Sequence, residues 1–164
     1  MKFSLYLRTI IFGITDSLVS TVGLLAGIDL SGTTRETIIL TGLVYAFVEA
    51  FSMAVGNFLS EESAEEYETR GAVGAKRAVA AGVVMFIAFV LAAFIPLAPY
   101  FFLRGYEALA VSVGVSIFAL FLGGVASGAA ARLPLLSRGL RMALLGGAAI
   151  LIGAAIGLVF KAPS

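Results

Sequence analysis

The sequence contains neither cysteine nor histidine, and only 13% of its 164 residues are charged. Without cysteine the chain has no disulfide, iron–sulfur cluster or thiolate zinc site. Without histidine it has no imidazole metal ligand and no Ser–His or Cys–His pair, so we expect neither an enzyme nor a tightly bound cofactor. A metal ion would have to bind through carboxylates, carbonyls, hydroxyls, amides or methionine. Those ligands suit Mn²⁺ and Fe²⁺, with Mg²⁺ and Ca²⁺ as competitors.

Hydrophobic residues make up 60% of the chain, well above the share in soluble domains. They form five segments long enough to span a bilayer core of about 30 Å, at residues 8–28, 35–60, 76–98, 106–131 and 138–160. The second helix should continue to residue 68, because that part contains no Gly or Pro. Pro96 and Pro99 should end or kink the third. The sequence therefore predicts an all-α polytopic membrane protein, with residues 1–164 as one five-helix domain in the lipid bilayer.

The positive residues indicate how this domain is oriented. Eight of the 11 Lys and Arg residues fall on the side of the N-terminus, which predicts a cytoplasmic N-terminus and a C-terminus on the opposite side. Residues 61–75 are then a short acidic cytoplasmic connection between helices two and three. The net charge of +1, with no basic patch, predicts no nucleic-acid partner.

Two acidic residues, Asp16 and Glu49, lie inside apolar segments. At 1.5 Å per residue, Asp16 is about 12 Å inward from Arg8, and Glu49 about 16 Å inward from Ser60. A charge at the centre of a bilayer costs roughly 2.5–3.5 kcal/mol, so such residues need a partner, a proton or a cation. Because the first two helices run in opposite directions, the two acids share one layer if the helices pack side by side.

Met53 and Asn57 follow Glu49 at one-turn intervals and so extend its helix face. We expect Asp16, Glu49, Met53 and Asn57 to bind a divalent metal ion. A blander alternative is that Asp16 hydrogen-bonds locally to neighbouring hydroxyls and that Met53 fills the core, as most methionines do.

Five glutamates lie at the end of the second helix: Glu61, Glu62, Glu65, Glu66 and Glu68. Acids at a helix C-terminus oppose the helix dipole, and like charges four residues apart repel each other. Bound cations would relieve both penalties, so we expect Glu61, Glu62, Glu65 and Glu66 to collect metal ions. The alternative is a solvated helix end whose charges are balanced by nearby Arg and Lys.

Three pairs of glycines have the spacing that lets transmembrane helices approach closely: Gly23 and Gly27, Gly124 and Gly128, and Gly153 and Gly157. We expect most of them to pack helices within the chain. Five helices do not divide into two equal inverted halves. A mechanism that alternates between two symmetric units would therefore need a homodimer.

Four stretches carry a family resemblance: FGITDSLVSTVGLLAGI, EAFSMAVGNFLS, KRAVAAGVVMFIAFVLAAFIPLAPYFF and LFLGGVASG. Through them the chain resembles the vacuolar iron transporter family over nearly its whole length. The resemblance implies a five-helix protomer, a homodimer with its pathway at the subunit interface, and transport of Fe²⁺ or Mn²⁺ out of the cytoplasm in exchange for protons. Asp16 and Met53 match the family's intramembrane metal residues. We expect a multi-pass protein of a prokaryotic cell membrane.

The chain departs from the family pattern at three places. Plant members have an acid where this chain has Tyr45, and many bacterial members have Glu where it has Asn57. The large cytoplasmic metal-binding domain of plant members is absent, because only about 15 residues join helices two and three.

A competing hypothesis is a membrane scaffold or metal sensor that binds cations at residues 61–68 and transports none.

Overall fold

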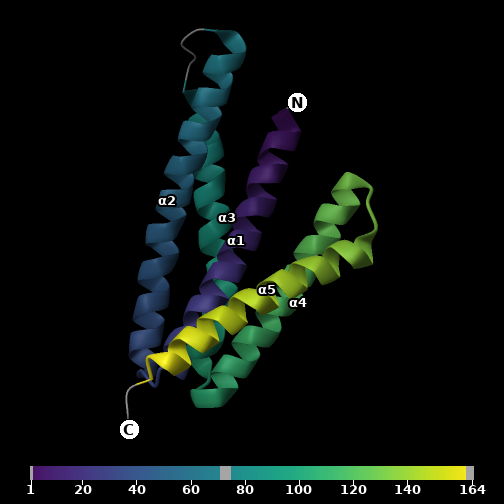
Figure 1. Ribbon diagram of the computed structural model, residues 1–164. Helices are drawn as coiled ribbons and strands as arrows, with labels where there is room; N and C mark the ends of the chain where they lie inside the picture. The colour runs from purple at the N-terminus through teal and green to yellow at the C-terminus, as the bar shows by residue number, and fades with distance from the viewer. Residues whose placement is uncertain (1, 71–74, 162–164) are drawn as a thin grey trace.

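The computed structural model describes residues 2–70 and 75–161, which form five α-helices: α1 (Lys2–Leu30), α2 (Arg35–Thr69), α3 (Lys76–Phe102), α4 (Gly105–Ala131) and α5 (Leu135–Val159) (Figure 1). Each is long and apolar enough to cross a membrane. The all-α, five-helix prediction is confirmed, as is the continuation of α2 through the glutamates. Residues 71–74 of the expected acidic connection, and residues 1 and 162–164 of the expected domain, lie outside the described part.

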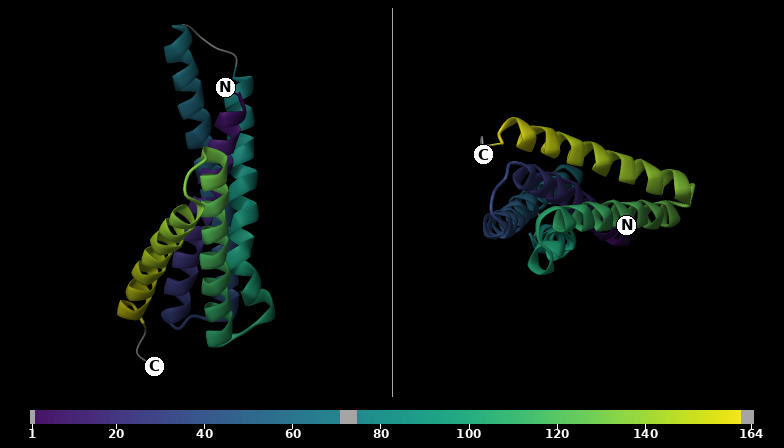
Figure 2. Two further views of the ribbon diagram at one scale, coloured as in Figure 1. Left: turned by 90° about the vertical axis from the view of Figure 1, so that its right-hand side faces the viewer. Right: turned by 90° about the horizontal axis from the view of Figure 1, so that it is seen from below.

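Helix α1 is the centre of the bundle, because it packs against each of the other four helices. Its side chains Leu18, Val22 and Leu25 are fully buried. Helices α2 and α3 run alongside it, whereas α5 crosses it at a steep angle and packs on α1 and α4 (Figures 1 and 2). We call the end of the bundle that holds the start of α1 and the end of α2 the N-terminal end.

The crossing of α1 and α5 brings two backbones into contact. A Cβ atom added to Gly153 would meet the carbonyl oxygen of Gly23, and one added to Gly157 would meet that of Gly27. Gly124 of α4 is likewise pressed against the backbone of Arg138 at the start of α5. The prediction that these glycines pack helices within the chain is confirmed, and α5 depends on them for its position.

The predicted end of the third helix, at residue 98, is too early. Helix α3 continues through Pro96 and Pro99 to Phe102. Neighbouring helices supply hydrogen bonds to its final turns, as membrane proteins require where proline interrupts a helix. Ser112 of α4 donates to the Pro96 carbonyl at 2.6 Å. Arg35 donates to the carbonyls of Tyr100 and Phe101 at 2.6 and 2.5 Å.

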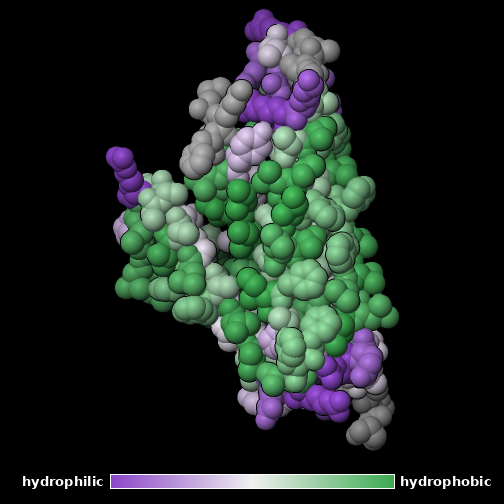
Figure 3. Space-filling view, turned by 180° about the vertical axis from the view of Figure 1, so that it is seen from behind, coloured by the Kyte–Doolittle hydropathy of each residue, from purple (hydrophilic) through white to green (hydrophobic). Residues whose placement is uncertain are grey.

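The surface has the distribution of polarity expected of a membrane protein. Apolar side chains form a broad middle band, and hydrophilic residues gather at the two ends of the bundle (Figure 3). Many large apolar side chains are exposed, for example those of Phe51, Leu91 and Leu151, at 65%, 67% and 71% of their surface. Lipid tails provide an apolar environment for such side chains, so the exposed band indicates contact with a bilayer.

Candidate functional site

Asp16 and Glu49 lie near each other across the α1–α2 interface, close enough for their charges to interact. One turn further along each helix, the Tyr45 side chain lies close to that of Ser20 and is near both carboxylates. We call these four residues the carboxylate layer. The shared depth predicted for the two acids is therefore found in the structure. Tyr45, which departs from the family pattern, places a phenol beside them.

The carboxylate groups of Asp16 and Glu49 have no hydrogen-bond or ion-pair partner within the described residues. The hydroxyls next to Asp16 are engaged elsewhere: Ser20 donates to the backbone carbonyl of Asp16 at 2.6 Å, and Ser17 donates to Phe89 at 2.7 Å. Thr15 donates to the Ile11 carbonyl at 2.7 Å. The alternative in which Asp16 is satisfied by local hydroxyls does not fit this geometry.

The carboxylate layer is the inner end of a longer row of polar residues on the facing sides of α1 and α2. Five pairs of residues, one from each helix, make up this row. Arg8 and Glu61 form an ion pair at its outer end. Thr9 with Asn57 and Phe12 with Met53 line one cavity, and Asp16 with Glu49 and Ser20 with Tyr45 are in electrostatic contact. Along α2, the row from Glu61 to Tyr45 covers 16 residues, or about 24 Å.

A cavity of about 550 Å³ lies between α1, α2 and α3 on the N-terminal side of the carboxylate layer. Its wall includes hydroxyl, amide and thioether groups from Thr9, Ser52, Ser60, Asn57, Met53 and Met85, and Arg8 and Phe12 also line it. Met53 and Asn57 were predicted from their spacing to Glu49, and the cavity brings them together. Asp16 and Glu49 do not line it, so the predicted metal residues divide between the cavity and the layer beyond it.

Sequence reasoning missed Thr9 and Met85. Met85 is buried within an apolar run of α3, where nothing in the sequence distinguishes it from core packing. Its approach to α1 depends on Gly13, because a Cβ at Gly13 would lie only 3.0 Å from the Met85 sulfur. Thr9 is fully inside the bundle, with 2% of its surface exposed. Nothing in the sequence marks Thr9 for this role, because which face of α1 it occupies depends on how the helices pack.

The predicted glutamate cluster is partly engaged by basic residues. Glu61 is buried and accepts a hydrogen bond from Arg8 at 2.8 Å, and Glu65 lies 3.9 Å from Arg77. Glu62 is half-buried and Glu66 is exposed. Across residues 2–70 and 75–161, no three acidic side chains converge as a metal site would require. Cation collection by these glutamates stays a prediction.

A third carboxylate on α1, Asp29, lies toward the other end of the bundle and was not anticipated. The Tyr100 hydroxyl of α3 donates to it at 3.0 Å. Thirteen residues separate Asp29 from Asp16, which is about 20 Å along the helix. Asp29 is thus a partnered acid outside the carboxylate layer.

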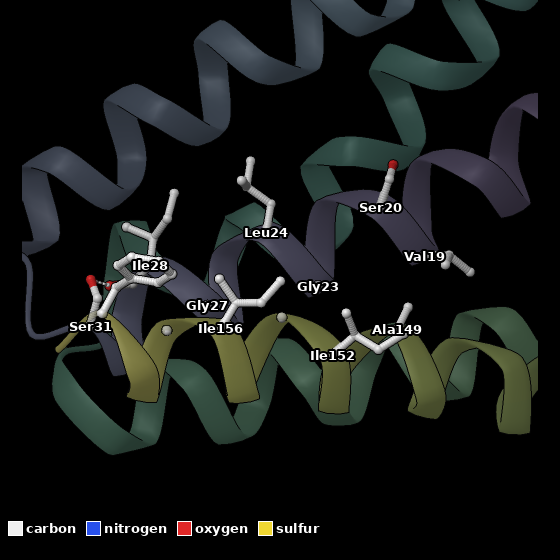
Figure 4. A pocket seen from close by; sticks show the side chains of 13 residues that line it. Val19, Ser20, Gly23, Leu24, Gly27, Ile28, Ser31, Ala149, Ile152 and Ile156 are labelled. Carbon is white, nitrogen blue, oxygen red and sulfur yellow. Dashed lines mark hydrogen bonds between the residues drawn. The ribbon is translucent and has the colours of Figure 1, made fainter.

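A second hollow, of about 530 Å³, runs between α1 and α5 and is mostly apolar (Figure 4). Its two hydroxyl groups already donate to carbonyls of their own helix, Ser20 to Asp16 at 2.6 Å and Ser31 to Ile28 at 2.7 Å. Glycine and aliphatic side chains complete the wall. Among the described residues, none that lines this hollow carries a carboxylate or thioether, so its chemistry does not suit a metal ion.

A model of the VIT family matches residues 7–79 and 69–158. The chain belongs to the VIT family. The matched ranges include the whole carboxylate layer and the cavity wall, and membership indicates an integral membrane transporter of metal ions. No curated protein matches the chain. The family predicted from the first- and second-helix motifs is confirmed, and the VIT family is a family of transporters, in keeping with the expectation that the chain is not an enzyme.

Proposed function

We propose that this VIT-family chain moves Fe²⁺ or Mn²⁺ out of the cytoplasm in exchange for protons. The observation that carries the proposal is the facing pair Asp16 and Glu49, which lack a partner among the described residues and lie deep within apolar helices. A divalent cation between two carboxylates relieves their mutual repulsion and supplies the missing counter-charge. Lipid tolerates such groups mainly on the pathways of ions or protons.

In the proposed cycle, the two carboxylates bind protons when no metal is present and release them when the metal arrives. Met53, one turn from Glu49, adds a thioether, a softer donor that suits Fe²⁺ better than Mg²⁺ or Ca²⁺, and the carboxylates suit Mn²⁺ as well. Exchange of one divalent ion for two protons moves no net charge. Transport with that ratio responds to the pH gradient and not to the membrane voltage.

A homodimer is part of the proposal. One chain offers two carboxylates and one thioether in this region, whereas Mn²⁺ commonly takes six ligands in octahedral sites. A second copy related by a two-fold axis would double the donor set. The excess of Lys and Arg at the N-terminal end supports a cytoplasmic location for that end, and we expect the membrane to be the cell membrane of a prokaryote.

The proposal is tested with purified protein in liposomes that contain a metal-sensitive dye and a pH-sensitive dye. We expect Mn²⁺ or Fe²⁺ flux accompanied by proton movement in the opposite direction, and loss of both in the Asp16→Asn, Glu49→Gln double variant. Asp29→Asn is the matched control, because it removes an acid from the same helix outside the carboxylate layer. Metal binding without any flux in the unaltered protein would favour the sensor hypothesis instead.

A further inference from the structure

The cavity between α1, α2 and α3 contains buried polar atoms with nothing to bind. The Thr9 hydroxyl and the Asn57 amide nitrogen have no hydrogen-bond partner among the residues that the structure describes. Both residues line the cavity, and only 2% of Thr9 is exposed. An unsatisfied buried polar group costs about 1–3 kcal/mol, so a polar occupant would stabilise this wall.

The remaining donors indicate what kind of occupant fits. Ser52 contributes a hydroxyl, and Met53 and Met85 contribute thioethers from two different helices, α2 and α3. These groups are neutral, so they suit an ion that keeps part of its water shell. Its bound waters donate to the hydroxyl oxygens, and the Asn57 amide nitrogen donates to a further water. At about 30 Å³ per water in the liquid, a cavity of about 550 Å³ has room for such an ion.

The cavity lies between the N-terminal end of the bundle and the carboxylate layer. Asn57 lies one turn from Glu61 at the N-terminal end of the row and two turns, or about 12 Å, from Glu49. An ion that travels between the end of the bundle and the carboxylate layer along the facing sides of α1 and α2 passes this cavity.

An ion pair occupies the outer edge of the cavity. Arg8 lines the cavity and binds Glu61 at 2.8 Å, with the Arg8 side chain 72% exposed and the Glu61 side chain 11% exposed. The guanidinium thus neutralises Glu61, which lies one turn beyond Asn57 of the cavity wall. An incoming cation must displace Arg8 to use Glu61, and the exposed Arg8 side chain is free to move into solvent.

We propose that this cavity is a second metal site, an entrance site for a partly hydrated divalent cation, which Thr9 and Met85 help to bind together with Met53 and Asn57. The Arg8–Glu61 ion pair closes it. The inference rests on the proposed function for the identity of the ion, but the site itself is defined by binding and is measurable without transport.

The binding test uses the Asp16→Asn, Glu49→Gln protein in detergent, so that the carboxylate layer no longer competes. Titration with Mn²⁺, followed by electron paramagnetic resonance, should show a site in each chain. Thr9→Val should weaken it about fivefold, the loss expected for one hydrogen bond. Thr21→Val is the matched control, because Thr21 is also a buried α1 threonine without a hydrogen-bond partner in the described residues, yet it does not line the cavity.

Ser52→Ala provides a second variant at an exposed position of the same wall, where misfolding is not a concern. We expect it to weaken Mn²⁺ binding in the same direction as Thr9→Val. Equal Mn²⁺ affinity in Thr9→Val, Ser52→Ala and Thr21→Val would overturn the site, provided that all three elute as folded protein in size-exclusion chromatography.

The role of the ion pair is tested by transport in liposomes. Arg8→Gln should lower the apparent KM for Mn²⁺ about two- to fivefold, the range that corresponds to a partly exposed ion pair. Arg77→Gln, which removes the partner of Glu65 outside the cavity, should leave KM unchanged. The exchanged pair Arg8→Glu, Glu61→Arg should return KM toward that of the unaltered protein, because it restores the bond with the charges reversed.

The outcomes separate this inference from the proposed function. If the unaltered protein carries no metal but Thr9→Val still weakens Mn²⁺ binding, the proposed function fails and the site stands. If the protein transports Mn²⁺, while Arg8→Gln leaves KM unchanged and Thr9→Val binds like Thr21→Val, the site and its closing ion pair are wrong and the proposed function stands.

Discussion

Helix α1 has two contrasting interfaces. Toward α2 it presents Thr9, Asp16 and Ser20, and side chains there enclose a cavity with polar donors. Toward α5 it presents Gly23 and Gly27, and the two backbones touch. The hollow beside this backbone contact has an apolar wall whose two hydroxyls are already hydrogen-bonded, whereas the polar interface keeps ligand groups within reach of a cation. One helix thus supports the fold on one side and the chemistry on another.

The largest expected effect is a loss of metal flux without a loss of stability, which would show that the polar interface serves transport and not the fold. In the Asp16→Asn, Glu49→Gln variant, metal flux should fall about 100-fold or more, because even the loss of groups that only support metal ligands typically costs 10–100-fold. Thermal stability should not fall, because both acids are protonated in the metal-free state of the proposed cycle and the variant replaces each by a neutral amide of similar size. Thermal melts in detergent, followed by circular dichroism, measure the second effect. A variant that lost both flux and stability would show that the acids hold the fold together.

Much of this architecture was predictable because apolar length and helix rise are local properties of the sequence. The five helices followed from uninterrupted apolar runs, and α2 was expected to extend through the glutamates because no Gly or Pro stops it. The shared depth of Asp16 and Glu49 followed from 1.5 Å per residue along two antiparallel helices. Depth is set by position along one chain segment, so it needs no knowledge of packing.

The features that were missed depend on how the helices are rotated about their axes. Arg8 bonds to Glu61, 53 positions away, and Met85 reaches the cavity only because Gly13 makes room. Neither contact has a local signal. The end of the third helix expected at residue 98 was too early for the same reason, since the groups that support the last turns of α3 come from α4 and from Arg35.

The second prediction concerns the glycine contact between α1 and α5. Gly153→Ala places a Cβ against the backbone of Gly23, and we expect it to lower the free energy of unfolding by about 1–3 kcal/mol, as overpacking does. Gly147→Ala on the same helix is the control, because its Cβ would meet nothing within 4 Å. It should instead stabilise by about 0.5–1 kcal/mol through the higher helix propensity of alanine. Melts of the two variants in detergent test this contrast, and equal melting temperatures would mean that α1 and α5 do not pack this closely.

The smallest effect concerns the side of α1 that faces α3. Ser17, next to Asp16 in the sequence, is fully buried and donates to the Phe89 carbonyl at 2.7 Å. Ser17→Ala should cost about 0.6 kcal/mol, the average for hydrogen bonds between helices in a membrane, and should leave metal flux intact. Ser116→Ala is the matched control, because that buried hydroxyl donates within its own helix, to Ser112 at 2.7 Å, and ties no two helices together. If Ser17→Ala lowered flux as strongly as Asp16→Asn while the protein stayed folded, the polar chemistry of α1 would extend beyond its α2 side, and the division between its interfaces would have to be redrawn.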